Sequence, residues 1–220
     1  MKSDIIGSIE STKIIAIVRG IYGEQLLSLA QALVKGGICN IEVTFDQSAA
    51  DAQEKTGRAI ELLCKQLSGD IFVGAGTVLT IEQVDAAVQS GASYIISPNT
   101  DLDIIKRTKE HGLISIPGAM TPSEILTAYK AGADFVKVFP VIDLGLAYIK
   151  NIRAPINHVK LVATAGINEE NFADFLGAGF CAAGISGRLT DKTVIEAGNF
   201  DELTRRAKAF IQIAQKSGDI

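Results

Sequence analysis

Short runs of apolar, mostly β-branched residues alternate along the chain with longer segments whose apolar residues recur every three or four positions. Runs of the first kind predict buried strands, and segments of the second kind predict amphipathic helices. The clearest helical segments are residues 24–35, 50–66, 81–89, 102–111 and 201–216. The eight predicted strands are residues 14–18, 40–44, 71–73, 94–96, 114–116, 135–139, 159–162 and 181–184.

This alternation predicts the fold class. Strands joined through helices form right-handed βαβ units, whose parallel strands are buried on both faces and are therefore almost entirely apolar. Eight such units close an α/β (β/α)8 TIM barrel, and 220 residues lie at the compact end of that fold. An open doubly wound sheet is the alternative, but no G-x-G-x-x-G turn follows the first strand. We expect a single barrel domain over residues 1–220, with an extra N-terminal helix at residues 3–11 across its bottom.

Composition and charge exclude several classes of function. The chain is 47% hydrophobic and carries a net charge of −4 without a basic block, so neither a nucleic-acid binder nor a polybasic membrane anchor is expected. No apolar run approaches the roughly 20 residues of a membrane-spanning helix, and the N-terminus lacks the features of a secretory signal. These observations predict a soluble, cytoplasmic protein.

The cysteines and histidines indicate neither disulfides nor a metal centre. Cys39, Cys64 and Cys181 are an odd number without a C-x-x-C pair, and we expect them to be small buried hydrophobic residues. His111 and His158 have no second ligand at metal spacing. No metal site is therefore predicted.

Polar residues at the ends of the predicted strands are the candidates for chemistry, because in this fold those ends face the active site. Side-chain alternation directs Arg19 after the first strand, Glu42 in the second and Lys137 in the sixth toward one barrel mouth. Neutral polar groups and turns follow other strands, at Thr77, Pro98 and Thr164. Three charged side chains are thus expected to converge.

Lys137 gives the sharpest chemical signal. Its ammonium group in the run 135–140 would be desolvated, which lowers its pKa and exposes a nucleophilic amine suited to Schiff-base chemistry. The alternative is a snorkelling or ion-paired lysine. Glu42 beside it could shuttle protons as general acid and base, or could be a buried counter-ion of Arg19 or Lys137.

Five motifs, in this order and spacing, give the chain a family resemblance. They are Ile-Glu-Val-Thr at 41–44, Val-Gly-Ala-Gly-Thr-Val-Leu at 73–79, Ile-Ser-Pro at 96–98, Ile-Pro-Gly at 116–118 and Val-Lys-Val-Phe-Pro at 136–140. The chain resembles, over almost its whole length, the class I bacterial aldolases that cleave 2-keto-3-deoxy-6-phosphogluconate and related 4-hydroxy-2-oxo acids. The resemblance implies that Lys137 forms the Schiff base, Glu42 shuttles protons and Thr77 binds the pyruvyl carboxylate. It also implies a homotrimer and no metal or organic cofactor.

The loops after the last two strands are the expected site of a substrate phosphate, which in this fold meets backbone N–H groups there. The expected substrate-binding residues in these loops are Thr164, Ala165, Gly166, Gly184 and Ser186. The family motif has two consecutive glycines where this chain has Ala165 and Gly166, so close approach of a ligand is expected to be partly obstructed. Arg188 is either a further phosphate partner or an ordinary exposed arginine.

A second departure concerns the substrate carboxylate. The best-known family members carry an arginine two residues after the threonine of the second strand, and this chain has Asp46 there. A carboxylate brought into a water-poor mouth needs a compensating charge. Our hypothesis is that Arg19 supplies it, the alternative being that Arg19 only pairs with Glu42 or Asp46.

These observations define competing functions. The first is an aldolase that cleaves a 2-keto-3-deoxy-6-phospho sugar acid to pyruvate and an aldehyde such as glyceraldehyde 3-phosphate. A close alternative is a 4-hydroxy-2-oxoglutarate aldolase, which releases pyruvate and glyoxylate. A phosphate-binding barrel isomerase or synthase would instead use Glu42 as an enolising base, and a non-catalytic sensor would bind the sugar acid without turnover. The predicted partner is in each case a small molecule.

Overall fold

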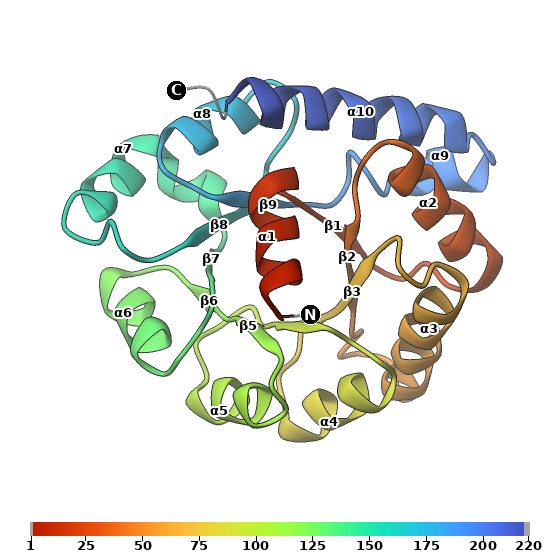
Figure 1. Ribbon diagram of the computed structural model, residues 1–220, viewed down its shortest axis with the longest axis horizontal. Helices are drawn as coiled ribbons and strands as arrows, with labels where there is room; N and C mark the ends of the chain where they lie inside the picture. The colour runs from red at the N-terminus through yellow and green to blue at the C-terminus, as the bar shows by residue number, and fades with distance from the viewer. Residues whose placement is uncertain (1, 218–220) are drawn as a thin grey trace.

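The computed structural model describes residues 2–217, and within them nine parallel strands form one ring (Figure 1). Their order around the ring is β5-β4-β3-β2-β1-β9-β8-β7-β6. The strands are β1 (Ile14–Val18), β2 (Asn40–Thr44), β3 (Phe72–Gly76), β4 (Tyr94–Ile96), β5 (Ile114–Ile116), β6 (Gly118–Ala119), β7 (Val136–Val138), β8 (Leu161–Thr164) and β9 (Ala182–Ile185).

The ninth strand arises because the fifth predicted strand continues past Pro117 and is counted there as β5 and β6. A proline has no N–H to donate, so the ladder is interrupted at this residue. Hydrogen bonds nevertheless continue on both sides: the Ser97 N–H donates to the Ile116 carbonyl at 3.3 Å and the Lys137 N–H to the Pro117 carbonyl at 2.9 Å. The ring is thereby joined between β4 and β7, and the predicted barrel class is confirmed.

Helices surround the strand ring, and the first helix, α1 (Lys2–Thr12), lies across it (Figure 1). The surrounding helices are α2 (Gly23–Lys35), α3 (Ala52–Gln66), α4 (Ile81–Gln89), α5 (Leu102–Glu110), α6 (Pro122–Lys130), α7 (Val141–Arg153), α8 (Phe172–Gly177), α9 (Lys192–Glu196) and α10 (Phe200–Lys216). The five helices given by periodicity are confirmed to within two residues. None of the helices in the described part of the chain is long and apolar enough to cross a membrane.

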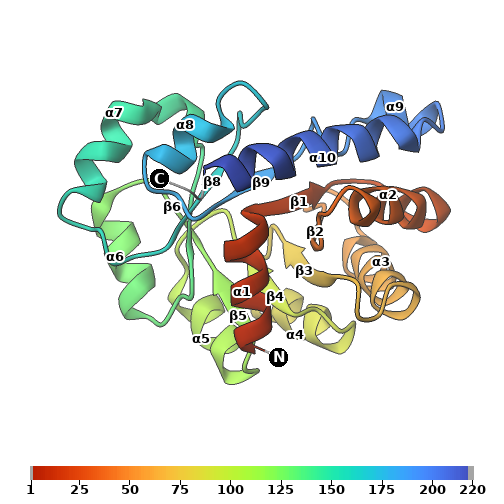
Figure 2. The same cartoon turned by 45° about the horizontal axis from the view of Figure 1, so that its top comes forward.

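Helix α1 closes one end of the barrel, as predicted for the N-terminal segment. Figures 1 and 2 show it lying across the centre of the strand ring. Ile5 and Ile9 insert into the barrel interior, and Asn40 at the start of β2 donates to the Thr12 hydroxyl at 2.9 Å and accepts from the Ser8 hydroxyl at 3.0 Å. This end carries the amino termini of the strands, so the carboxyl ends form the open mouth.

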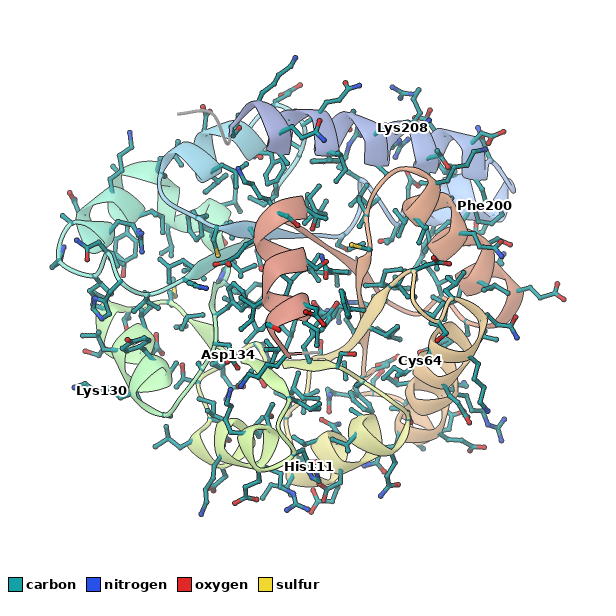
Figure 3. All side chains as sticks on the ribbon, in the orientation of Figure 1. Cys64, His111, Lys130, Asp134, Phe200 and Lys208 are labelled. Carbon is teal, nitrogen blue, oxygen red and sulfur yellow. The ribbon has the colours of Figure 1, made fainter. Side chains whose placement is uncertain are left out.

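The expectation of buried cysteines is wrong, because the side chains of all three are only half-buried. Their thiols are free. Each has a polar neighbour. The Cys39 Sγ lies 3.1 Å from the Ser8 hydroxyl, and the thiols of Cys64 and Cys181 donate to the carbonyls of Gly91 at 3.4 Å and Leu161 at 3.1 Å. Burial still raises the pKa of Cys181 to about 12. Figure 3 places Cys64 and His111 among the outer helices, and residues 2–217 contain no acidic, histidine or cysteine cluster arranged to hold a metal ion.

Candidate active site

A cavity of about 610 Å³ opens at the carboxyl ends of the strands. The structure brings all ten sequence candidates to its wall: Arg19, Glu42, Thr77, Pro98, Lys137, Thr164, Ala165, Gly166, Gly184 and Ser186. Further lining residues come from the same strands and loops, namely Ile17, Phe139, Ile167, Asn168, Gly187 and Arg188. The alternation that places Ile17 with Arg19 and Phe139 with Lys137 could have identified two of these from the sequence.

Glu42 is held in the barrel interior by its place in β2 and is only 2% exposed. Its carboxylate lies against Gly76 of β3, where any Cβ would overlap the Oε1 atom. Burial raises the pKa of Glu42, and the nearby charges of Lys137 and Arg19 oppose that shift. A carboxylate whose pKa is raised by burial in this way is suited to accept and return a proton.

Lys137 projects from β7 into the same cavity and is 8% exposed. Burial lowers the pKa of its ammonium group, Glu42 opposes this shift and Arg19 adds to it. The Nζ atom lies 4.9 Å from the centre of the Phe139 ring, a cation–π distance. Among the described residues Lys137 and Glu42 interact only through their fields, without an ion pair or a hydrogen bond. A buried lysine without a bound partner has the features of an amine nucleophile.

Lys160 lies next to a strand at the opposite end of the barrel. It immediately precedes β8 and pairs with Glu10 of α1 at 2.6 Å. It is therefore absent from the open mouth.

Arg19 directly follows β1 and is exposed at the rim of the cavity. Within residues 2–217 its guanidinium makes neither an ion pair nor a hydrogen bond. Its charge opposes the rise in the pKa of Glu42 and adds to the lowering of the pKa of Asp46 by the hydrogen bonds from Ser48. Asp46 is engaged elsewhere, since it accepts from the backbone N–H of Ser48 at 3.0 Å and from its hydroxyl at 2.7 Å. The guanidinium fork is available for an anion.

Thr77 follows β3 with φ = +56°, a left-handed conformation that is rare for a β-branched residue. Two glutamines hold it there: the Gln47 amide donates to the Thr77 carbonyl at 2.7 Å, and the Gln83 amide donates to Gln47 Oε1 at 3.0 Å. Strain of this kind gathers where a side chain must be aimed at a ligand. Neither glutamine was a candidate from the sequence, because their pairing spans 36 residues of chain.

The loop after β8 also carries a strained residue. Ala165 has φ = +82°, next to Gly166 at φ = +78°. The Asn171 side chain donates to the Gly166 carbonyl at 2.8 Å and fixes this loop. Because L side chains rarely adopt this conformation, alanine here is less favourable than glycine would be.

Arg188 is paired rather than free. Its Nε and Nη2 atoms each donate to a carboxylate oxygen of Glu169 at 2.9 Å. This bidentate contact joins the loops that follow β8 and β9 and occupies the guanidinium. The structure thus favours a role in joining these loops over direct phosphate binding.

Two glycines make room for other lining residues. A Cβ at Gly118 would overlap the carbonyl of Pro98, and one at Gly184 would crowd the Thr164 hydroxyl. The loop after β4 and the end of β8 can therefore approach neighbouring strands closely. The glycines shape the cavity without contributing chemistry.

A barrel whose open end gathers a buried lysine, a buried carboxylate and an arginine without an ion pair among the described residues belongs to the class of (β/α)8 enzymes that act on small molecules. The family model for KDPG and KHG aldolases matches residues 5–206, so the chain belongs to this aldolase family.

Individual relatives agree with this assignment. The chain is 32% identical to the 2-dehydro-3-deoxy-phosphogluconate aldolase of Treponema pallidum, over 95% of this chain and 97% of that protein. It is 30% identical to the 2-dehydro-3-deoxy-6-phosphogalactonate aldolase of Escherichia coli, over 88% and 95%. A crystal structure of the KDPG aldolase of Legionella pneumophila, with pyruvate captured as a covalent carbinolamine, superimposes with a TM-score of 0.83 at 27% identity, covering 93% of this chain and 97% of that one.

Proposed function

We propose that this aldolase cleaves a 2-keto-3-deoxy-6-phospho sugar acid to pyruvate and an aldehyde, such as glyceraldehyde 3-phosphate, through a Schiff base on Lys137. The observation that carries the proposal is Lys137 itself, which is buried, unpaired within the described residues and in the same cavity as Glu42. The covalent carbinolamine of pyruvate in the Legionella relative supports it.

Each step uses a group of this cavity. The neutral amine of Lys137 adds to the C2 ketone, and loss of water gives a protonated imine that accepts electrons. Glu42 removes the proton of the C4 hydroxyl, the C3–C4 bond breaks, and its electron pair forms the enamine while the aldehyde leaves. The enamine takes a proton at C3, and water then hydrolyses the imine to pyruvate and free Lys137.

Binding is assigned to the remaining candidates. Arg19 and Thr77 bind the carboxylate, because a guanidinium at the rim can form two charge-assisted hydrogen bonds. The phosphate binds to the loops after β8 and β9, and Pro98 lines the path between the two ends. The candidate phosphate-binding residues are Thr164, Ala165, Gly166, Gly184 and Ser186.

A second substrate, 4-hydroxy-2-oxoglutarate, follows from a specific feature. Ala165 places a methyl group in the loop where a phosphate would approach the backbone. An unphosphorylated substrate has no such requirement. A panel of C4 epimers and chain lengths, assayed by pyruvate release, separates the two.

The proposal is tested by borohydride reduction in the presence of pyruvate. Protein mass spectrometry should show one covalent pyruvyl adduct, and peptide mapping should locate it at Lys137. Lys137→Ala should lose both the adduct and pyruvate release, whereas Lys208→Ala on the outer surface of α10 should keep both. A barrel isomerase or synthase would gain no adduct, and that result would overturn the Schiff-base assignment.

The assembly is a further part of the proposal. We propose the homotrimer that the family resemblance implies. Light scattering on the purified protein tests it, because a monomer or a dimer would contradict it.

A further inference from the structure

Tyr94 carries a buried hydroxyl that contributes no hydrogen bond to the described part of the fold. The side chain is fully buried at the centre of the barrel, and its oxygen has no hydrogen-bond partner among the described residues. The backbone N–H of Gly74 is near, but not within the distance and angle of a hydrogen bond. Burying a hydroxyl in this state is costly, and such groups are rare in folded proteins.

The position of this hydroxyl follows from strand register. Glu42 of β2 is aligned with Gly74 of β3, and Gly74 with Tyr94 of β4, so the three residues form one row on the interior face. A Cβ at Gly74 would overlap the edge of the Tyr94 ring. Because glycine stands between them, the ring extends across β3 toward Glu42.

Packing explains the ring but not its oxygen. A phenylalanine would fill the space above Gly74 equally well, and it would avoid the desolvated hydroxyl. Burial raises the pKa of Tyr94 well above its ordinary value, and the carboxylate of Glu42 adds to this shift, with a smaller contribution from Cys39. The charged groups that face Glu42 from other strands are Lys137 of β7 and Arg19 after β1.

We propose that Tyr94 is a positioning residue for proton transfer: its hydroxyl donates to the Glu42 carboxylate when that group is ionised and holds it ready to act as a base. The inference rests on the proposed function, in which Glu42 is the base. Burial alone favours the neutral acid, and a donor aimed at the carboxylate opposes this, as do the two cations. The unpaired hydroxyl of Tyr94 lowers the stability of the resting fold, and it stabilises the site only when the Glu42 carboxylate is ionised.

The test is the pH profile of Tyr94→Phe, measured as exchange of the methyl protons of pyruvate for deuterium by NMR. Exchange needs the imine and a base but no aldehyde. Loss of a donor to the charged form raises the pKa of Glu42, so the acid limb of the profile should move upward by about one pH unit. Tyr129→Phe, on the exposed face of α6, is the matched control and should leave the profile unchanged.

Two further measurements separate a positioning role from a structural one. Tyr94→Phe should unfold at the same or a higher temperature than the parent, because it removes an unsatisfied polar group. Protein labelled with 3-fluorotyrosine keeps the hydroxyl but makes it a stronger donor, so its acid limb should move downward, and Tyr94→Phe in the labelled protein should abolish that shift.

An acid limb of Tyr94→Phe that overlays the parent's would overturn the proposal. If Tyr94→Phe does not fold, the test rests on the protein labelled with 3-fluorotyrosine. An acid limb that does not move in that protein would likewise overturn the proposal. Borohydride trapping with pyruvate is run alongside. Lack of an adduct in the parent would reject the Schiff base itself, whereas an adduct with an unmoved limb rejects only the role of Tyr94.

Discussion

The Glu42 carboxylate reaches from β2 diagonally over Gly76 of β3, so closely that a side chain at position 76 would overlap it. Two residues earlier, Gly74 makes the same room for the ring of Tyr94. The two glycines of the Gly-Ala-Gly sequence in β3 therefore support function because they have no side chains. It lets a carboxylate and an aromatic ring from the two neighbouring strands share the space inside the barrel.

Gly76→Ala should damage catalysis much more than folding. The added methyl group would push the Glu42 carboxylate away from its position, and misplacement of a catalytic group by about 1 Å costs roughly 100-fold in rate. The loss should appear in kcat for pyruvate release, with a destabilisation of about 1–3 kcal/mol from overpacking.

The matched control is Gly7→Ala in α1, where a Cβ meets nothing within 4 Å. It should leave turnover at the parent's value. A Gly76→Ala enzyme with full kcat would mean that the position of the Glu42 carboxylate is unimportant.

Glu42→Gln should keep imine formation, lose most of its turnover and be more stable than the parent at neutral pH. The amide retains the shape but accepts no proton, so borohydride trapping persists while pyruvate release falls by about 100-fold to 10,000-fold.

The stability part follows from the sign of the pKa shift. The pKa of Glu42 is raised by burial, so the native state holds this proton more tightly than the unfolded state, and its stability falls as pH rises through the unfolded and then the folded pKa. The neutral amide avoids that loss, by on the order of 1 kcal/mol. The gain should vanish in acid, where both side chains are uncharged. Denaturant melts at acidic and neutral pH check this, and an equal gain at both would contradict it.

Much of this architecture could be predicted from sequence because parallel strands buried on two faces are almost purely apolar. Against that background Glu42 and Lys137 stand out as charges that are costly to place in a strand. The same rule brought ten scattered positions to one cavity, since strand ends converge by topology. Their individual roles stay predictions.

The differences lie where distant contacts override local pattern. The third strand extends to Gly76, although glycine is a poor strand former, because Tyr94 and Glu42 need the space. The strand predicted at 159–162 is wrong by two residues, since β8 covers Leu161–Thr164. No propensity predicts a left-handed Thr77, whose conformation depends on Gln47 and Gln83.

Ala165→Gly should stabilise the protein and strengthen phosphate binding. The residue stands at φ = +82°, a conformation that costs an alanine about 1–2 kcal/mol more than a glycine. Removing the methyl group also opens the backbone to an anion. KM should fall for phosphorylated substrates and stay constant for 4-hydroxy-2-oxoglutarate.

Gly166→Ala, the opposite change in the same loop, serves as the comparison. Its φ of +78° and the contact of an added Cβ with Ile142 predict lower stability and a higher KM for phosphorylated substrates. An Ala165→Gly enzyme that gains stability but no phosphate preference would move the phosphate site away from this loop.

Arg19→Lys should weaken pyruvate binding while leaving the fold unchanged. Arg19 is exposed and makes no ion pair within the described residues, so little native structure depends on it. Asp46 already accepts two hydrogen bonds from Ser48, and its negative charge cannot bind a carboxylate. A lysine keeps the charge of Arg19 but cannot form a bidentate contact, so binding should weaken by about 1–3 kcal/mol, roughly 5-fold to 150-fold in Kd.

The concentration dependence of borohydride trapping measures the affinity for pyruvate, with Arg58→Lys on the surface of α3 as the control for loss of an arginine. A pyruvate affinity equal to the parent's would mean that Arg19 does not bind the substrate carboxylate and that Thr77 binds it alone.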